Sequence, residues 1–85
     1  FNLAQNYPNP FNPTTQIAYS LEKDTRVELD VYNIQGKKVA SLVSEYQKAG
    51  DYNVVWDASN VSAGIYFIKL SSLGSSDIKK CTLLK

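Results

Sequence analysis

The sequence predicts an all-β fold, a small antiparallel immunoglobulin-like β-sandwich of about six or seven strands. Three observations support this prediction. Apolar and polar residues alternate with a period of two in several short segments, turn signals recur roughly every eight to twelve residues, and 85 residues leave room for one domain only. With 44% hydrophobic and 20% charged residues, the composition is that of an ordinary globular protein.

Residues 1–14 are predicted to form an extended lead-in that packs on the sandwich. This segment contains all three prolines, which fix φ and favour extended conformations in the residues that precede them. Tyr7 and Phe11 lie among these prolines, and we expect both rings to fold back over the sandwich. Residues 15–85 then form the sandwich itself.

The first two strands have the clearest pattern. In residues 15–21 the large side chains of Ile17, Tyr19 and Leu21 occupy every second position, which predicts a strand with one buried face. A charged turn follows, and residues 26–31 alternate valine and leucine with charged side chains. Asn33 to Gly36 then predicts a tight turn, because glycine can adopt the left-handed conformation that hairpin loops need.

The next segment is ambiguous. A hairpin partner is expected at residues 37–43, followed by a loop, because the preceding turn has hairpin chemistry. However, Val39, Leu42, Val43 and Tyr46 also fit the three- and four-residue spacing of an amphipathic helix. We favour the strand and keep the helix as the alternative.

The second half of the chain predicts three more strands. Residues 52–56 alternate in the same way as the first strand, and residues 57–64 form a turn-rich connector. Residues 65–70 are rich in β-branched and aromatic side chains, which favours a well-buried strand in the middle of a sheet. A Ser/Gly loop at 71–76 leads into the last strand, residues 78–84.

Charge and composition exclude several classes of function. Nine basic residues against eight acidic ones give a net charge of +1, so no nucleic-acid partner is expected. The chain has no histidine and one cysteine, Cys81, which excludes a Cys/His zinc cluster, a Ser-His-Asp triad and an internal disulfide. We expect no cofactor, no metal, no membrane insertion and no export signal of the usual N-terminal kind.

Two further groups of side chains could carry chemistry. The acidic residues are scattered singly, which predicts solvated faces and turn caps; Asp24, Asp51 and Asp57 are the candidates for calcium bound between strand ends. Tyr52 and Trp56 share one face of a predicted strand, and we expect that face to be core. If these rings were exposed in a row, they could instead stack on sugars.

The C-terminal segment has two interpretations. Lys79 and Lys80 lie close to Leu83, Leu84 and Lys85. The lysines could simply protect an edge strand against aggregation. Alternatively, a partner could recognise this strand and tail through edge pairing, with lysine and leucine side chains providing specificity.

Motifs along nearly the whole chain carry a resemblance to a known family. They are Asn6-Tyr7-Pro8-Asn9-Pro10-Phe11-Asn12-Pro13-Thr14-Thr15, Val31-Tyr32-Asn33 with Gly36, Ala49-Gly50, Trp56-Asp57, Ser62-Ala63-Gly64-Ile65-Tyr66 and Lys79-Lys80 with Leu83-Leu84-Lys85. In this order they resemble the type A C-terminal sorting domain of the type IX (Por) secretion system. Immunoglobulin-like domains of flagellar hook-capping proteins are similar in the middle of the chain only.

The resemblance implies a C-terminal secretion signal on a larger protein of a Bacteroidetes-like Gram-negative bacterium. A separate signal peptide would take the parent protein to the periplasm, where this domain would address it to the outer-membrane translocon and its shuttle proteins. A sortase-like surface protease would then remove the domain, and the cargo would be attached to the cell surface or released. We expect a monomer, with an edge-strand dimer as the alternative.

The resemblance also implies roles for individual residues. Those expected to be recognised by the secretion machinery are Gly64, Tyr66, Lys79, Lys80, Leu83, Leu84 and Lys85. Those expected near the processing region are Tyr7, Pro8, Asn9, Pro10 and Phe11. Cys81 and Thr82 depart from the apolar residues usual in the last motif. We expect no enzyme activity; the alternative function is an accessory carbohydrate-binding or spacer domain of a secreted glycoside hydrolase.

Overall fold

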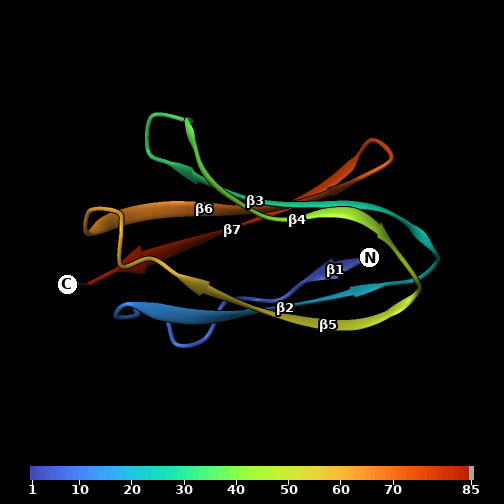
Figure 1. Ribbon diagram of the computed structural model, residues 1–85, viewed down its shortest axis with the longest axis horizontal. Helices are drawn as coiled ribbons and strands as arrows, with labels where there is room; N and C mark the ends of the chain where they lie inside the picture. Colours follow the sequence, from blue (N-terminus) through green and yellow to red (C-terminus); the bar gives the residue numbers. More distant parts are fainter. Residues whose placement is uncertain (85) are drawn as a thin grey trace.

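A computed structural model describes residues 1–84 of the chain as two antiparallel sheets packed face to face (Figure 1). The predicted all-β sandwich is confirmed: the described residues form seven strands and no helix. The three-stranded sheet has the order β1-β2-β5, with β1 at Asn2–Leu3, β2 at Thr14–Leu21 and β5 at Gly50–Asp57. The four-stranded sheet has the order β4-β3-β6-β7, with β3 at Thr25–Asn33, β4 at Lys38–Gln47, β6 at Gly64–Ser72 and β7 at Ser75–Leu83.

The core lies between the inner faces of the two sheets. Alternation along β2 and β3 turns every second side chain inward, so Ile17, Val27 and Leu29 are completely buried. Ile68 and Leu70 of β6 are buried to the same degree. The prediction that β6 occupies the middle of a sheet is confirmed, since β6 pairs with both β3 and β7.

The ambiguous segment is a strand, and the helical alternative is wrong. β4 extends to Gln47, beyond the predicted end at residue 43, and pairs with β3 throughout. Its register shifts twice, because Val43 pairs with Leu29 while Ser41 pairs with Asp30, and a second shift follows near Val39. Each shift inserts one extra residue into β4, which breaks the strict alternation. These two irregularities produce the three- and four-residue spacing that resembled a helix.

The predicted loop at residues 71–76 is also wrong. β6 and β7 continue to a two-residue hairpin turn, with Ser72 paired to Ser75 across it. Leu73 has φ 45° and Gly74 has φ 84°, so both turn residues are in the left-handed region. Two-residue turns that connect the strands of a hairpin commonly have this backbone conformation, and Gly74 adopts it without steric cost.

Candidate functional site

The residues expected to be recognised come from two segments, and the fold places them side by side. Gly64, at the start of β6, pairs with Leu83 at the end of β7. Two residues further along β6, Tyr66 pairs with Cys81. The hairpin register therefore brings the Gly-x-Tyr segment and the C-terminal segment together at one end of the β6–β7 strand pair.

The two lysines of β7 lie on opposite sides of the sheet. Lys79 faces Ile68 across the strand pair and shares the inner side with Cys81, although its own side chain is only half-buried. Lys80 faces Phe67 on the outer side and is exposed. The lysine pair therefore cannot present one continuous charged face.

The two leucines of the C-terminal segment also differ. Leu83 is 1% exposed and belongs to the core, whereas Leu84 follows β7 and is 50% exposed. Lys85, the last residue expected to be recognised, lies outside the described residues. In the described part of the tail, Leu84 is thus the apolar side chain that a partner could reach.

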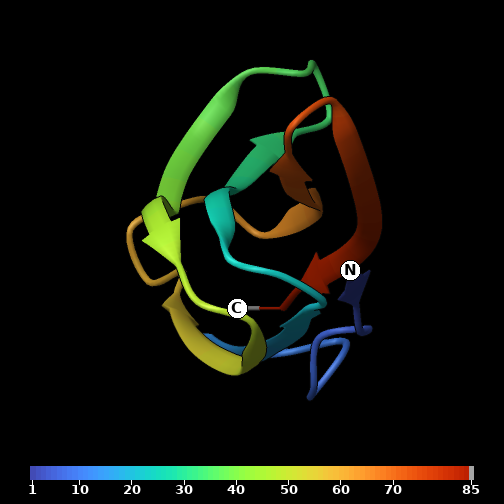
Figure 2. The same cartoon turned by 90° about the vertical axis from the view of Figure 1, so that its right-hand side faces the viewer.

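The lead-in runs along the outer edge of β7, where β1 lies beside β7 in Figure 2. The Leu3 amide donates a hydrogen bond to Oδ2 of Asp77 at 3.2 Å. Further along, Nε2 of Gln5 donates to the Lys80 carbonyl oxygen at 2.9 Å. A backbone acceptor at the strand edge is therefore already occupied by the lead-in.

The contact continues to the end of the strand. The Thr82 amide donates to Oδ1 of Asn9 at 3.0 Å, and the Thr82 carbonyl accepts from the Phe11 amide at 3.0 Å. The Phe11 carbonyl in turn accepts from the Leu84 amide at 2.8 Å. Residue numbers rise together in both segments, so the lead-in lies parallel to β7.

Phe11 is the apolar anchor of this contact. Its ring is 2% exposed, with its centroid 5.5 Å from that of Trp56. Trp56 contacts Tyr66 in an edge-to-face arrangement at 5.6 Å, and the Tyr66 hydroxyl donates to the Ser62 carbonyl at 2.6 Å. Tyr66 is therefore a buried structural residue that connects β6, through Trp56, to the site where Phe11 of the lead-in packs.

Tyr7 differs from Phe11, because its side chain is 80% exposed. Its backbone nevertheless exchanges two hydrogen bonds with Gln16 of β2, at 3.0 and 2.9 Å. The expectation that both rings fold over the sandwich is therefore wrong for Tyr7.

Between these two contacts the lead-in bends at residues 8–10 and is not extended. The Pro8 carbonyl accepts from Nδ2 of Asn6 at 3.2 Å and from the Thr15 hydroxyl at 2.9 Å, and Asn6 also donates to Thr15 at 2.9 Å. Asn6 and Thr15 are 2% and 1% exposed, so these hydrogen bonds satisfy buried polar groups. Sequence reasoning did not single out this pair; the one available signal was the position of Thr15 on the inner face of β2.

Cys81 lies on the buried face of β7 and is 1% exposed. Burial disfavours the thiolate and raises the pKa of the Cys81 thiol to about 11, while a backbone hydrogen bond with Tyr66 acts in the opposite direction. The thiol is therefore protonated at neutral pH and behaves as a small core side chain. The departure from the usual apolar residue does not make this face of β7 polar.

Two of the three acidic side chains considered for calcium, Asp24 and Asp57, have structural partners. Asp24 accepts a hydrogen bond from the Ala49 amide at 2.9 Å, and Asp57 accepts one from the Ser59 amide at 3.0 Å. Across residues 1–84, no three acidic, cysteine or histidine side chains are grouped as a metal ion would require. The same residues contain no helix with the length and apolar character needed to cross a membrane.

The aromatic residues considered for sugar stacking belong largely to the core. Trp56 is 3% exposed, as expected. Tyr52 is half-buried; its ring stacks on that of Tyr19 at 5.3 Å and its hydroxyl donates to the Lys48 carbonyl at 2.6 Å. The rings of Tyr52 and Trp56 therefore do not form an exposed row.

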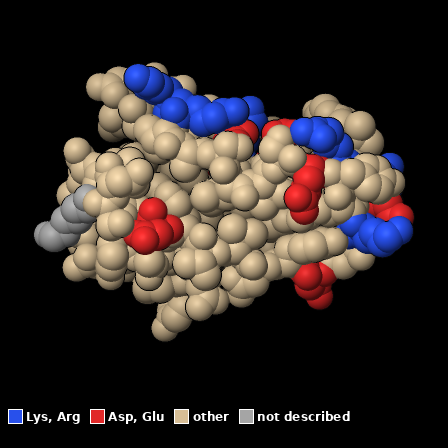
Figure 3. All heavy atoms as spheres, in the orientation of Figure 1, with Lys and Arg blue, Asp and Glu red and all other residues tan. Residues whose placement is uncertain are grey.

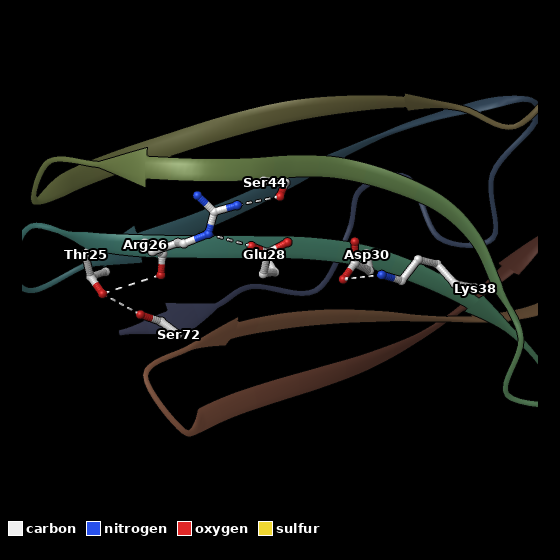
Figure 4. A network of polar contacts seen from close by, with 7 residues as sticks. All are labelled: Thr25, Arg26, Glu28, Asp30, Lys38, Ser44 and Ser72. Carbon is white, nitrogen blue, oxygen red and sulfur yellow. Dashed lines mark hydrogen bonds and ion pairs between the residues drawn. The ribbon is translucent and has the colours of Figure 1, made fainter.

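The outer face of the four-stranded sheet carries polar contacts along β3 (Figure 4). Nε of Arg26 donates to Glu28 at 3.0 Å. Further along, Nζ of Lys38 lies 3.4 Å from Oδ2 of Asp30, whose side chain is only 6% exposed. Oδ1 of Asp30 is buried without a protein hydrogen-bond partner. The alternation of residues 26–31 predicts that Asp30 points into solvent, so its burial on the outer face of the sheet could not be predicted from this pattern.

Comparison with known protein families gives a match to most of the chain. A family model described as "Secretion system C-terminal sorting domain" matches residues 5–83, which include β7 and the lead-in residues Gln5, Asn9 and Phe11 that contact it. No curated protein and no solved structure matches the chain.

Proposed function

Because this chain belongs to the family of secretion system C-terminal sorting domains, we propose that it delivers a larger cargo protein to the outer-membrane translocon of a type IX secretion system. At the level of the family, the domain is a sorting signal for type IX secretion and interacts with the secretion machinery. Its family is not an enzyme family, and the signal implies export to the cell surface or the extracellular space.

The finer steps form part of the same proposal. The parent protein passes through the periplasm, where shuttle proteins and the translocon bind the domain. A sortase-like surface protease then cuts at or ahead of the lead-in, near the residues Tyr7, Pro8, Asn9, Pro10 and Phe11, and the cargo is attached to the surface or released. In this scheme residues 1–14 are the lead-in of a single domain whose sandwich comprises residues 15–85.

The recognised residues divide into two groups according to their burial. Lys80 and Leu84 are exposed, and we assign them to direct contact with the machinery. Tyr66 and Leu83 are buried, so their role is to hold this end of the sandwich in shape. The remaining residues of the motif, which we assign to neither group, are Gly64, Lys79 and Lys85.

One observation carries this assignment: Gly64 and Leu83 are paired. The two motif segments are separated in sequence but adjacent in space, so a partner could contact both at once. Because the lead-in already bonds to the carbonyls of Lys80 and Thr82, recognition through side chains and the tail requires less rearrangement than pairing along this edge.

A fusion experiment tests the proposed function. A reporter enzyme placed ahead of residues 1–85 is expressed in a bacterium that has type IX secretion and in an isogenic strain without the translocon. We expect surface or extracellular reporter in the first strain and periplasmic reporter in the second. Lys80→Glu combined with Leu84→Ser is expected to retain most of the reporter in the periplasm.

The matched control is Lys23→Glu combined with Val55→Ser, which makes the same charge reversal and a comparable aliphatic-to-serine change at exposed positions away from the motif. This control should be exported like the unmodified fusion. Equal export of both double variants would overturn the assignment of Lys80 and Leu84. Mass spectrometry of the exported reporter should find no peptides from residues 15–85, whereas their retention would contradict cleavage.

A further inference from the structure

The outer face of the four-stranded sheet contains a row of side chains that lies outside the core, and only Lys80 of this row belongs to the C-terminal motif. Lys38 of β4 pairs with Tyr32 of β3, Tyr32 pairs with Phe67 of β6, and Phe67 pairs with Lys80 of β7. Residues directly opposite each other in antiparallel strands point to the same side. The row therefore presents two aromatic rings with a lysine at either end, and we call it the Lys-aromatic row.

An apolar hollow lies against this row. It has a volume of about 450 Å³ and is lined mainly by Tyr32, Phe67, Ile34, Ile78 and the stem of Lys69. Ile34 is 69% exposed and Ile78 is 52% exposed, although both are large aliphatic residues. Exposed aliphatic side chains that surround aromatic rings are typical of a surface covered by a partner.

The charge around the hollow is positive. In the next row Asp30 pairs with Lys69, and Lys69 pairs with Ile78. Three lysines, at 38, 69 and 80, against the single carboxylate of Asp30 give the two rows a net charge of 3 − 1 = +2. Figure 3 shows lysine and arginine side chains gathered along the upper side of the molecule, which carries the four-stranded sheet in this orientation.

The carboxylate itself is not available to a ligand. Asp30 is 4% exposed and its Oδ2 lies 3.4 Å from Nζ of Lys38, so it fixes one lysine beside the rings. Lys80 is exposed at the opposite end of the Lys-aromatic row. A ligand would therefore meet ammonium groups at both ends and apolar surface between them.

From this arrangement we propose that the outer face of the four-stranded sheet binds an acidic segment of a partner protein, with a large apolar side chain of that segment in the hollow and flanking carboxylates at the lysines. The proposal deepens the proposed function, because the partner would belong to the machinery that handles the sorting signal. Burial of an apolar side chain against Ile34 and Ile78 is favourable. A sugar would instead place hydroxyl groups against these aliphatic residues, at a desolvation cost.

A peptide titration tests this proposal on the intact chain. The ¹⁵N-labelled domain is titrated with the peptide Asp-Glu-Phe-Glu-Asp and with its basic counterpart Lys-Arg-Phe-Arg-Lys. We expect saturable amide shifts at Tyr32, Phe67 and Lys80 with the acidic peptide, and binding at least about tenfold weaker with the basic one. Equal binding of the two peptides, or shifts confined to other strands, would overturn the proposal.

A pair of matched variants tests whether binding depends on the side chains around the hollow. Lys69→Glu combined with Ile78→Ser should weaken binding of the acidic peptide about tenfold or more, because it reverses one charge and removes apolar surface. Lys23→Glu combined with Val55→Ser makes the same charge reversal and a comparable aliphatic-to-serine change elsewhere, and should alter binding by less than about twofold. Far-UV circular dichroism establishes that both variants are folded.

Two other occupants would appear as distinct outcomes. Tighter binding of polygalacturonate than of the acidic peptide to the same amides would overturn the proposal in favour of an anionic glycan. Shifts of the same amides with protein concentration, together with a dimer in sedimentation, would overturn it in favour of a second copy. If the reporter fusion is exported but the acidic peptide does not bind, this proposal fails and the proposed function stands. If the fusion is not exported, the proposed function fails, whether or not the peptide binds.

Discussion

Phe11 and Leu83 form a parallel bridge that ties the start of the domain to its last strand. The Phe11 backbone bonds on both sides of Leu83, to the Thr82 carbonyl and the Leu84 amide, while the two side chains are almost completely buried. The lead-in is therefore part of the same packed unit as the C-terminal motif.

Phe11→Ala is expected to lower the free energy of unfolding by about 3–5 kcal/mol, because it removes a buried ring and leaves a cavity beside Trp56. Urea denaturation measures this change. Tyr7→Ala, in the same lead-in but at a side chain that is 80% exposed, should change stability by less than about 0.5 kcal/mol. Equal losses in the two variants would mean that Phe11 is not the anchor.

Leu73→Asn is expected to stabilise the domain by about 1 kcal/mol. Leu73 has a positive φ of 45° in the two-residue turn between β6 and β7, and asparagine tolerates that conformation better than leucine. Thermal and urea unfolding both report the change. Leu73→Ala is the control, since alanine removes the side chain but keeps the backbone penalty; a gain as large as that of asparagine would contradict the explanation.

Lys38→Met should destabilise the domain by about 1–3 kcal/mol, because it leaves the buried carboxylate of Asp30 without its cation. Lys38→Arg should retain most of the stability. In a double-mutant cycle measured by urea denaturation, adding Asp30→Asn to Lys38→Met should recover part of the loss. Strict additivity of the two changes would show that the two side chains are not coupled.

The stability of the domain should decrease as pH rises from about 9 to about 11, the range between the ordinary pKa of a cysteine thiol and that of Cys81. In this range the unfolded chain loses the Cys81 proton before the folded chain does, so the folded state binds more protons and rising pH favours unfolding. Urea midpoints at pH 8, 9 and 10 measure the effect.

Cys81→Ala is the control for this pH dependence. Burial also raises the pKa of Tyr19, so both proteins lose further stability as pH rises above 10.0, the ordinary pKa of tyrosine. The difference between the two pH curves therefore isolates the thiol. Parallel curves would contradict the assignment.

The parts of the fold that follow strict alternation could be predicted from the sequence. β2 and β3 have one buried face each, and the local pattern is enough to place Ile17 and Val27 inside. β4 could not be read in this way, because its two extra residues depend on its pairing with β3. The β6–β7 turn was missed because a leucine occupies a position where asparagine or glycine would be the expected signal.

The candidate site was predicted less completely than the fold. The motif residues could be chosen from the sequence, but the sequence does not distinguish Leu83 from Leu84, which differ in burial because only one of them faces the core. The contacts between the lead-in and β7 join residues more than 70 positions apart, as between Leu3 and Asp77. Such contacts arise from tertiary packing, and no local pattern encodes them.

The parallel course of the lead-in along β7 also determines how the domain responds to mechanical load. A pull that enters before Leu3 and leaves after Leu84 drags two parallel segments in opposite directions, so the bonds from Leu3 to Phe11 are strained together in shear and not opened one at a time. A secretion machine that pulls on the C-terminal tail would therefore load the whole sandwich before any single strand separates from it.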